Sequence, residues 1–199
     1  MRNLLISDTG IQSSGVLVAS IDTKLHKLEP ESRRQAFQQL EQRIRTQPGV
    51  VSVAPIWLSP FSGHGWNESV QAEGKDSASG KKEVWMNRIG PGYFETMATP
   101  LLAGRDFESH DDMTGSKVAI VNSLFAKSFF NGANPVGRSF RIEGDSGEED
   151  KVFQIVGLVT NTVQRPSGGV SGHRVLPPRS GAEDAGKHQF HGSDSWIDQ

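Results

Sequence analysis

Two groups of residues have types that could ligate a metal ion. His188 and His191, with Asp194 nearby, are spaced to bind zinc if their segment were helical. That segment is rich in Gly, Ser and charged residues, which favours an irregular chain without a metal. An expected loop carries five carboxylates: Glu143, Asp145, Glu148, Glu149 and Asp150. Their spacing lacks the ordered alternation of an EF-hand loop, so we expect a solvated turn rather than a calcium site.

Residues for catalysis or ligand binding are few. His64 and Trp66 could recognise a ligand at a loop tip, but an exposed loop that tolerates them is the simpler interpretation. Arg105 and Asp106 could form a catalytic pair, but their Gly-Arg-Asp-Phe setting favours an ion pair that stabilises a turn. A hydrolase would need a cleft that joins His64 or His110 with Asp106 or Asp111. The sequence has no nucleophile elbow, paired-carboxylate motif or HExxH, so it predicts no catalytic, cofactor-binding or metal-binding residues.

The stretch NRIGPGYFETMATPLLAGRDF, residues 87–107, combines a Gly-Pro-Gly turn with a short aromatic helix. Phosphate binding at residues 90–92 would call for a following Lys-Ser/Thr or a GxGxxG pattern, and the stretch has neither. Glycine lets the chain reverse tightly, and the aromatic residues of the helix can then pack against the preceding strand. The residues expected in the core are Tyr93, Phe94, Met97, Leu101 and Leu102.

The composition of the chain argues against several classes of protein. Its 199 residues carry a formal net charge of −2, so there is no basic field of the kind that follows a nucleic-acid backbone. It contains no cysteine, which excludes disulfides, thiolate zinc sites and cysteine nucleophiles. Its apolar runs are far shorter than the roughly 20 residues that span a bilayer, and its N-terminus lacks the pattern of a secretory signal. We expect no nucleic-acid partner and no membrane-spanning helix.

Hydrophobic periodicity predicts two rounds of short strands and helices. In the first, residues 15–22 and 50–54 are expected strands, with a helix between them that begins at Pro30. This order is that of a βαβ unit. Residues 59–82 are expected to form an exposed loop with a short strand near residues 70–73.

The second round contains expected strands at residues 83–89 and 117–121. Asn122 can cap the helix that follows, because its side chain accepts hydrogen bonds from free N–H groups of the first turn. Residues 139–142 and 152–159 are expected to pair as a hairpin. The expected fold class is α+β, with βαβ-type lobes and short helices packed on mixed or antiparallel sheets.

Several motifs together resemble one protein family. The stretch WMNRIGPGYFETMATPLLAGRDF, followed by VAIVNSLFAKSFF, NPVGRSF and QIVGLV, is similar to the extracytoplasmic core domain of MacB-type ABC transporter permeases. It looks especially like the antimicrobial-peptide-transport-like permeases of that family. The upstream RQAFQQLEQRIRTQPGVVSVA resembles the family's first helix, Pro-Gly stop and second strand. The resemblance covers residues 15–160.

This resemblance implies a non-catalytic domain without cofactors, which couples movement of membrane helices to export or extraction of a substrate. The implied location is the extracytoplasmic face of the membrane. The implied partners are the transmembrane part of the permease, an ABC ATPase subunit and, in one arrangement, a second permease copy. The alternative is a free-standing extracytoplasmic module that binds a ligand or a protein through residues 59–82.

The sequence also departs from that family. It has no flanking membrane helices and no GxxxxGK[ST] loop, and Met1 stands where an intact permease would leave the bilayer. Residues 161–199 match none of the family's pattern, and their composition predicts a disordered tail. The expected organisation is an N-terminal arm or membrane-exit remnant (residues 1–14), the core domain (15–160) and the tail (161–199). A truncated or decayed permease product, or one segment of a longer protein, would have this organisation.

Overall fold

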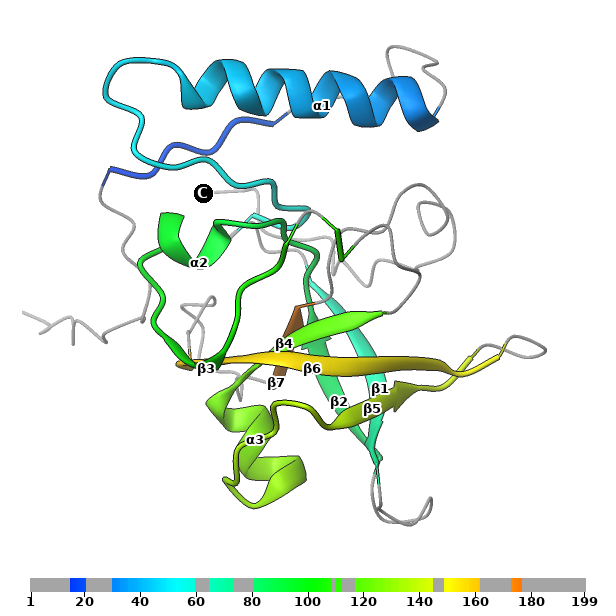
Figure 1. The fold of residues 1–199 in the computed structure, drawn as a ribbon. Coiled ribbons are helices and arrows are strands. Elements are labelled where there is room, and N and C mark those ends of the chain that lie inside the picture. The colour runs from blue at the N-terminus through cyan, green and yellow to red at the C-terminus, as the bar shows by residue number, and fades with distance from the viewer. Residues whose placement is uncertain are drawn as a thin grey trace, which may run out of the picture.

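The computed structural model describes residues 15–20, 30–59, 65–73, 81–108, 110–111, 117–144, 149–161 and 173–176 (Figure 1). Its helices are α1 (Pro30–Arg45), α2 (Tyr93–Thr96) and α3 (Ser123–Phe130). Its strands are β1 (Trp66–Ala72), β2 (Lys81–Met86), β3 (Leu101–Gly104), β4 (Val118–Asn122), β5 (Ser139–Ile142), β6 (Lys151–Val159) and β7 (His173–Leu176). Figure 1 shows α1 and α2 on one side of the sheet and α3 on the other.

The strands form one mixed, curled sheet in the order β3-β6-β4-β7-β2-β1-β5, and β5 also pairs with β6. The long strand β6 makes this closure possible, because its two halves have different neighbours. Residues 151–154 pair with β5, whereas residues 154–159 pair with β4. The sheet therefore curls into a ring of six strands, and β3 is attached to β6 outside that ring.

An aromatic core fills the ring. Phe140 of β5 and Phe153 of β6 stack with their ring centroids 5.3 Å apart, and Phe125 of α3 meets Phe140 edge-on at 5.4 Å. The Asn122 side chain caps α3 by accepting a hydrogen bond from the Phe125 N–H at 2.9 Å. This cap satisfies a donor that would otherwise be buried without a partner. The cap predicted from the sequence is confirmed.

A second apolar cluster lies on the other face of β4. Val118 and Ile120 pack in this cluster, whereas Ala119 and Val121 of the same strand pack in the aromatic core. The members that α2 and its C-terminal end contribute are Tyr93, Phe94 and Met97, as the sequence predicted. Gly92 has a φ of 81°, a conformation that glycine adopts without strain, and it lets α2 begin directly after the preceding turn.

Several predicted elements are confirmed. The first helix begins at Pro30, the short helix follows Gly92, and β5 and β6 form the expected hairpin. The fold class, short helices on a mixed sheet, is confirmed as well. These elements carry local signals: a proline or cap at the start, a breaker at the end, and a clear apolar period.

Three other predictions were wrong. Residues 15–20 and 50–54 are not strands, and Leu17 and Val51 are each 92 % exposed. β1 lies within the expected exposed loop 59–82. Its polar sequence WNESVQA forms a strand because it pairs with β2 and β5, and its last three residues are buried. Leu101 and Leu102 do not return to the core; they form β3 at the edge of the sheet and are exposed.

A further strand lies beyond residue 160. β7 runs parallel to β2 and antiparallel to β4, so it fills the position between these two strands. These four residues belong to the folded unit rather than to a disordered tail. For residues 162–172 and 177–199, and for the predicted arm 1–14, the prediction stays open because they lie outside the described residues.

Replacing Phe94 by alanine should lower the free energy of unfolding by about 3–5 kcal/mol, because it removes a buried ring and leaves a cavity. Phe94 is 5 % exposed and meets Tyr93 edge-on at 5.5 Å. Urea denaturation measures the change. Leu102→Ala is the matched control and should cost far less, since Leu102 is 53 % exposed. Equal losses in the two variants would contradict the packing of α2.

Ending the chain at residue 160 should destabilise the protein, because it removes β7 and leaves the facing edges of β4 and β2 without backbone partners. Hydrogen exchange would report this as faster exchange of the β4 and β2 amides. Ending the chain at residue 180 keeps β7 and serves as the control. Unchanged protection after truncation at residue 160 would show that β7 contributes nothing to the sheet.

Candidate functional site

Residues 50–58, which we call the connector, join α1 to the sheet. Residues 52–58 run beside residues 87–96, and this contact is called the joint below. At one end, the hydroxyls of Ser52 and Thr96 lie 3.0 Å apart. At the other, the chain continues through residue 59 toward β1. Since α1 precedes the connector, its direct chain connection to the sheet leads through the joint (Figure 1).

Asn87 holds the C-terminal end of the connector. Its Oδ1 accepts a hydrogen bond from the Leu58 N–H at 3.1 Å, and its Nδ2 donates to the Leu58 carbonyl at 2.9 Å. Both polar groups of one connector residue are thus satisfied by one side chain, which is itself 2 % exposed. A buried amide that loses such partners is costly, so Asn87 fixes the position of the connector strongly.

The middle of the joint is a short backbone ladder. Ile56 and Ile89 form an antiparallel bridge, the Trp57 N–H donates to the Arg88 carbonyl at 2.9 Å, and the Gly90 N–H donates to the Pro55 carbonyl at 2.9 Å. The Pro55 ring lies against Gly90 so closely that a Cβ at position 90 would collide with it. The Gly-Pro-Gly stretch therefore serves a close approach of two chains.

Two tryptophans and an arginine cover the joint. The Arg88 guanidinium carbon lies 4.9 Å from the ring centroid of Trp57 and 5.1 Å from that of Trp66. The two rings meet edge-on at 5.7 Å, and the Trp66 Nε1–H donates to Glu68 at 2.6 Å. Trp57 belongs to the connector and Trp66 begins β1, so Arg88 attracts both ends of the segment between them through cation–π contacts.

The turn after β3 contains a charged network. Arg105 forms two hydrogen bonds of 2.8 Å with the Asp111 carboxylate, and Asp111 is 5 % exposed. The hydrogen bonds from Arg105 lower the pKa of Asp111, a bond from the Glu108 N–H adds to this, and burial opposes it. Asp106 has another role, since it accepts from the Gly92 and Phe107 N–H groups. The predicted Arg105–Asp106 side-chain pair is therefore wrong, but the turn is indeed held by an ion pair.

The hydrolase arrangement has little support in this turn. His110 Nε2 lies 3.9 Å from Asp111 Oδ1, but His110 is 58 % exposed and also pairs with Glu108 at 3.2 Å. The Asp111 oxygens are already engaged by Arg105 and by the Glu108 N–H. His64 and the residues considered as zinc ligands, His188, His191 and Asp194, lie outside the described residues.

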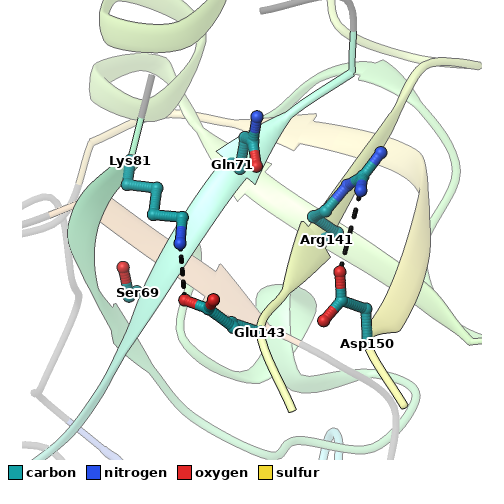
Figure 2. Close-up of a pocket in the computed structure, with 6 residues that line it drawn as sticks. All are labelled: Ser69, Gln71, Lys81, Arg141, Glu143 and Asp150. Atoms are coloured by element: carbon teal, nitrogen blue, oxygen red, sulfur yellow. Dashed lines mark hydrogen bonds and ion pairs between the residues drawn. The ribbon is translucent and has the colours of Figure 1, made fainter. Parts of the chain in front are cut away.

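The ends of the acidic loop are engaged in ion pairs. Glu143 accepts a hydrogen bond from Lys81 at 2.6 Å, and Asp150 lies 3.7 Å from Arg141. With Ser69 and Gln71 these four residues line a small polar hollow on the sheet (Figure 2). Asp145 and Glu148 are outside the described residues, and within the described part no three His, Asp or Glu side chains gather as a metal site.

Neither the joint nor the hollow was predicted from the sequence. Asn87 and Arg88 belong to the stretch 87–107 that the sequence analysis singled out. However, Asn87 bonds to Leu58, 29 residues earlier, and Arg88 contacts Trp57 and Trp66, which lie on two separate segments. The hollow depends on which residues face one another across strands. Long-range pairing of this kind has no local signal.

As the pH is lowered from 7 to 3, the free energy of unfolding should decrease more in the wild-type protein than in an Asp111→Asn variant. A carboxyl whose folded pKa is lowered contributes stability above its unfolded pKa, near 3.8, and that stability is lost as the pH falls through the folded pKa. At pH 7 the substitution should cost about 1–3 kcal/mol. Urea melts at pH 7 and pH 3 measure both effects, with Glu95→Gln on the exposed face of α2 as the control. If the free energies of unfolding of variant and wild type differed by the same amount at both pH values, the role of the ionised Asp111 in holding the turn would be contradicted.

Comparisons with known proteins give the following similarities. The periplasmic region of MacB from Actinobacillus actinomycetemcomitans has a TM-score of 0.47 and 17 % identity, over 71 % of this chain and 54 % of that one. The extracellular domain of the noncanonic ABC-type transporter YknZ from Gram-positive bacteria has a TM-score of 0.46 and 14 % identity, over 71 % and 61 %. The chain thus spans 54–61 % of these structures. No curated protein matches the sequence significantly.

In the part of the chain that the structure describes, no helix combines the length and apolar character that crossing a membrane requires. The sequence pattern of one family matches residues 4–196, and this match extends past residue 160 to include β7. That family is described as the MacB-like periplasmic core domain. Because the match covers nearly the whole chain, the protein belongs to the MacB-like periplasmic core domain family.

Proposed function

We propose that the chain is a non-catalytic extracytoplasmic part of an ABC transporter permease, which couples movement of membrane helices to export or extraction of a substrate. The family supports the permease setting. The observation that carries the coupling role is the joint, where side-chain, backbone and cation–π contacts together fasten the connector to the sheet. A displacement of α1 and the connector would be passed to the sheet through these contacts.

An element that transmits movement has to stay rigid, and the contacts of the joint restrict movement of the connector relative to the sheet. The Asn87 amide orients the Leu58 backbone through two hydrogen bonds, so it resists both sliding and rotation. The Pro55 ring against Gly90 leaves no room for the two chains to approach further. Packed elements of this kind shift as rigid bodies rather than deforming continuously.

The absence of catalysis remains part of the proposal. Among the described residues, the ionisable groups with shifted pKa values are Arg105 and Asp111, which are satisfied by each other and hold a turn. Such structural ion pairs shift pKa values without a catalytic role. The proposed partners are the transmembrane part of the permease, an ABC ATPase subunit and a second permease copy, on the extracytoplasmic face of the membrane.

A ligand-binding module is the second candidate, and one observation favours it. The hollow in Figure 2 brings together two cations, two carboxylates, a hydroxyl and an amide on one surface. Among the six residues, Ser69, Gln71 and Lys81 come from the segment 59–82 that the sequence singled out for binding. This second function does not exclude the first, because the hollow and the joint are formed by different residues.

Replacing Asn87 by alanine in a permease that carries this domain should reduce transport per ATP hydrolysed, because the connector loses its two hydrogen bonds. Lys127→Ala, an exposed change on α3, is the control. The chain has no cysteine, so Ser52→Cys with Thr96→Cys can introduce a single disulfide across the joint. In the Asn87→Ala background, oxidation should restore coupling and reduction should abolish it again.

Reconstituted vesicles allow both transport and ATP hydrolysis to be measured on the same sample. A normal transport-to-hydrolysis ratio in Asn87→Ala, with the variant folded by circular dichroism, would refute the coupling role of the joint. If oxidation did not restore the transport per ATP hydrolysed, Asn87 would not act by holding the connector, and this result would also contradict the proposal.

A further inference from the structure

The hollow lies on the outer face of three neighbouring strands. Across β2, β1 and β5, Lys81, Gln71 and Arg141 stand directly opposite one another in register. They form one row of two cations with an amide between them. Alternate residues of a strand face the same side, so Ser69 and Glu143 lie on this face next to the row. The intervening residues Val70 and Ile142 point into the core.

Ser69 is the smallest residue of the hollow and lies at one side of it, beside Lys81 and Glu143. The Lys81 ammonium reaches across to Glu143, and Arg141 lies on the far side (Figure 2). The hollow is shallow, with a cavity volume of only about 30 Å³. A ligand would therefore lie across the surface of the sheet rather than enter a cavity, with its polar groups on the side chains around the hollow.

The two ion pairs of the hollow can be replaced by a ligand at little cost. Arg141 contacts Asp150 only at 3.7 Å, which exceeds hydrogen-bond distance and leaves most of the guanidinium N–H groups for another acceptor. Lys81 and Glu143 are 40 % and 60 % exposed, and an exposed pair of this kind stabilises a protein only slightly. A ligand group that matches either charge therefore competes with a weak contact.

The balance of charge selects the type of ligand. Among the residues that line the hollow, two cations, Lys81 and Arg141, are matched by two anions, Glu143 and Asp150, and Glu83 stands opposite Ser69 on the same face. A simple anion would meet two carboxylates, and a simple cation would meet an ammonium and a guanidinium. A molecule that carries both charges can set its carboxylate against a cation and its ammonium against a carboxylate at the same time.

The repeat of the strand sets the scale of the ligand's length. Arg141 and Glu143 are two residues apart at β5, which places their Cα atoms about 6.8 Å apart on the same face. Two extended peptide residues span about 7 Å. We propose that the hollow binds a short zwitterion of dipeptide length, with its carboxylate on Arg141 and Gln71 and its ammonium on Glu143 and Ser69.

The test uses the full 199-residue chain and glycylglycine as the probe. Titration followed by NMR should give saturable shifts at the backbone amides of Ser69, Gln71 and Arg141, with a dissociation constant on the order of 10 mM or lower. Acetyl-glycylglycine, which lacks the ammonium, and glycylglycine amide, which lacks the carboxylate, should each bind at least about fivefold more weakly.

Variants of the hollow give the second arm. Arg141→Gln and Glu143→Gln should each weaken glycylglycine about fivefold, whereas Lys127→Gln and Glu95→Gln, which remove the same charges from exposed helix positions, should leave it unchanged. Equal binding by all three peptide probes, or equal effects of the hollow and control variants, would overturn the proposal. Preferential binding of phosphoethanolamine over glycylglycine would assign the hollow to a lipid headgroup and would also overturn it.

Discussion

β4 is buried on both faces, and the arrangement of the other elements follows from this. All five of its residues are buried, with Ala119 and Val121 in the aromatic core and Val118 and Ile120 in the cluster around α2. A strand of this kind needs backbone partners on both edges and an apolar layer on each face. β6 and β7 supply the edges, α3 lies in one layer and α2 in the other.

The same strand also connects the core to its surroundings. Asn122 ends β4, begins α3 with its cap, and donates from Nδ2 to Asn161 just beyond β6 at 3.0 Å. The cluster on the other face includes Ile89 and is packed against Ala54 and Ile56 of the connector. The joint is therefore the outer part of a continuous packed layer that begins at β4, which explains how a short ladder can be held firmly.

The sequence predicted those elements whose signals are local. α1, α2, α3 and the β5–β6 hairpin each have a proline, a cap or a turn at their ends and a regular apolar period between them. Residues 15–20 and 50–54 have equally apolar sequences but are not strands, because a strand exists only where a partner chain supplies hydrogen bonds. β1 shows the reverse: its polar sequence became a strand because β2 and β5 flank it.

The candidate sites were less predictable for the same reason. Arg105 was expected to pair with its neighbour Asp106, but a turn brings Asp111 to it, and the Asp106 carboxylate is used by the backbone of residues 92 and 107. The joint and the hollow depend on register between distant strands, and a shift of one residue would turn their side chains to the other face. Composition and spacing along one chain do not contain that information.

The place of β7 in the sheet also sets an order of assembly. β7 is the last described strand of the chain, yet its position is between β4 and β2. During synthesis the ribosome has to release residue 176 before the ring can close. Until then the nascent chain presents two open strand edges, one of them on β4, whose five residues are all buried in the folded protein. Such edges can pair with other strands, so the chain is most open to mispairing in the interval before β7 arrives.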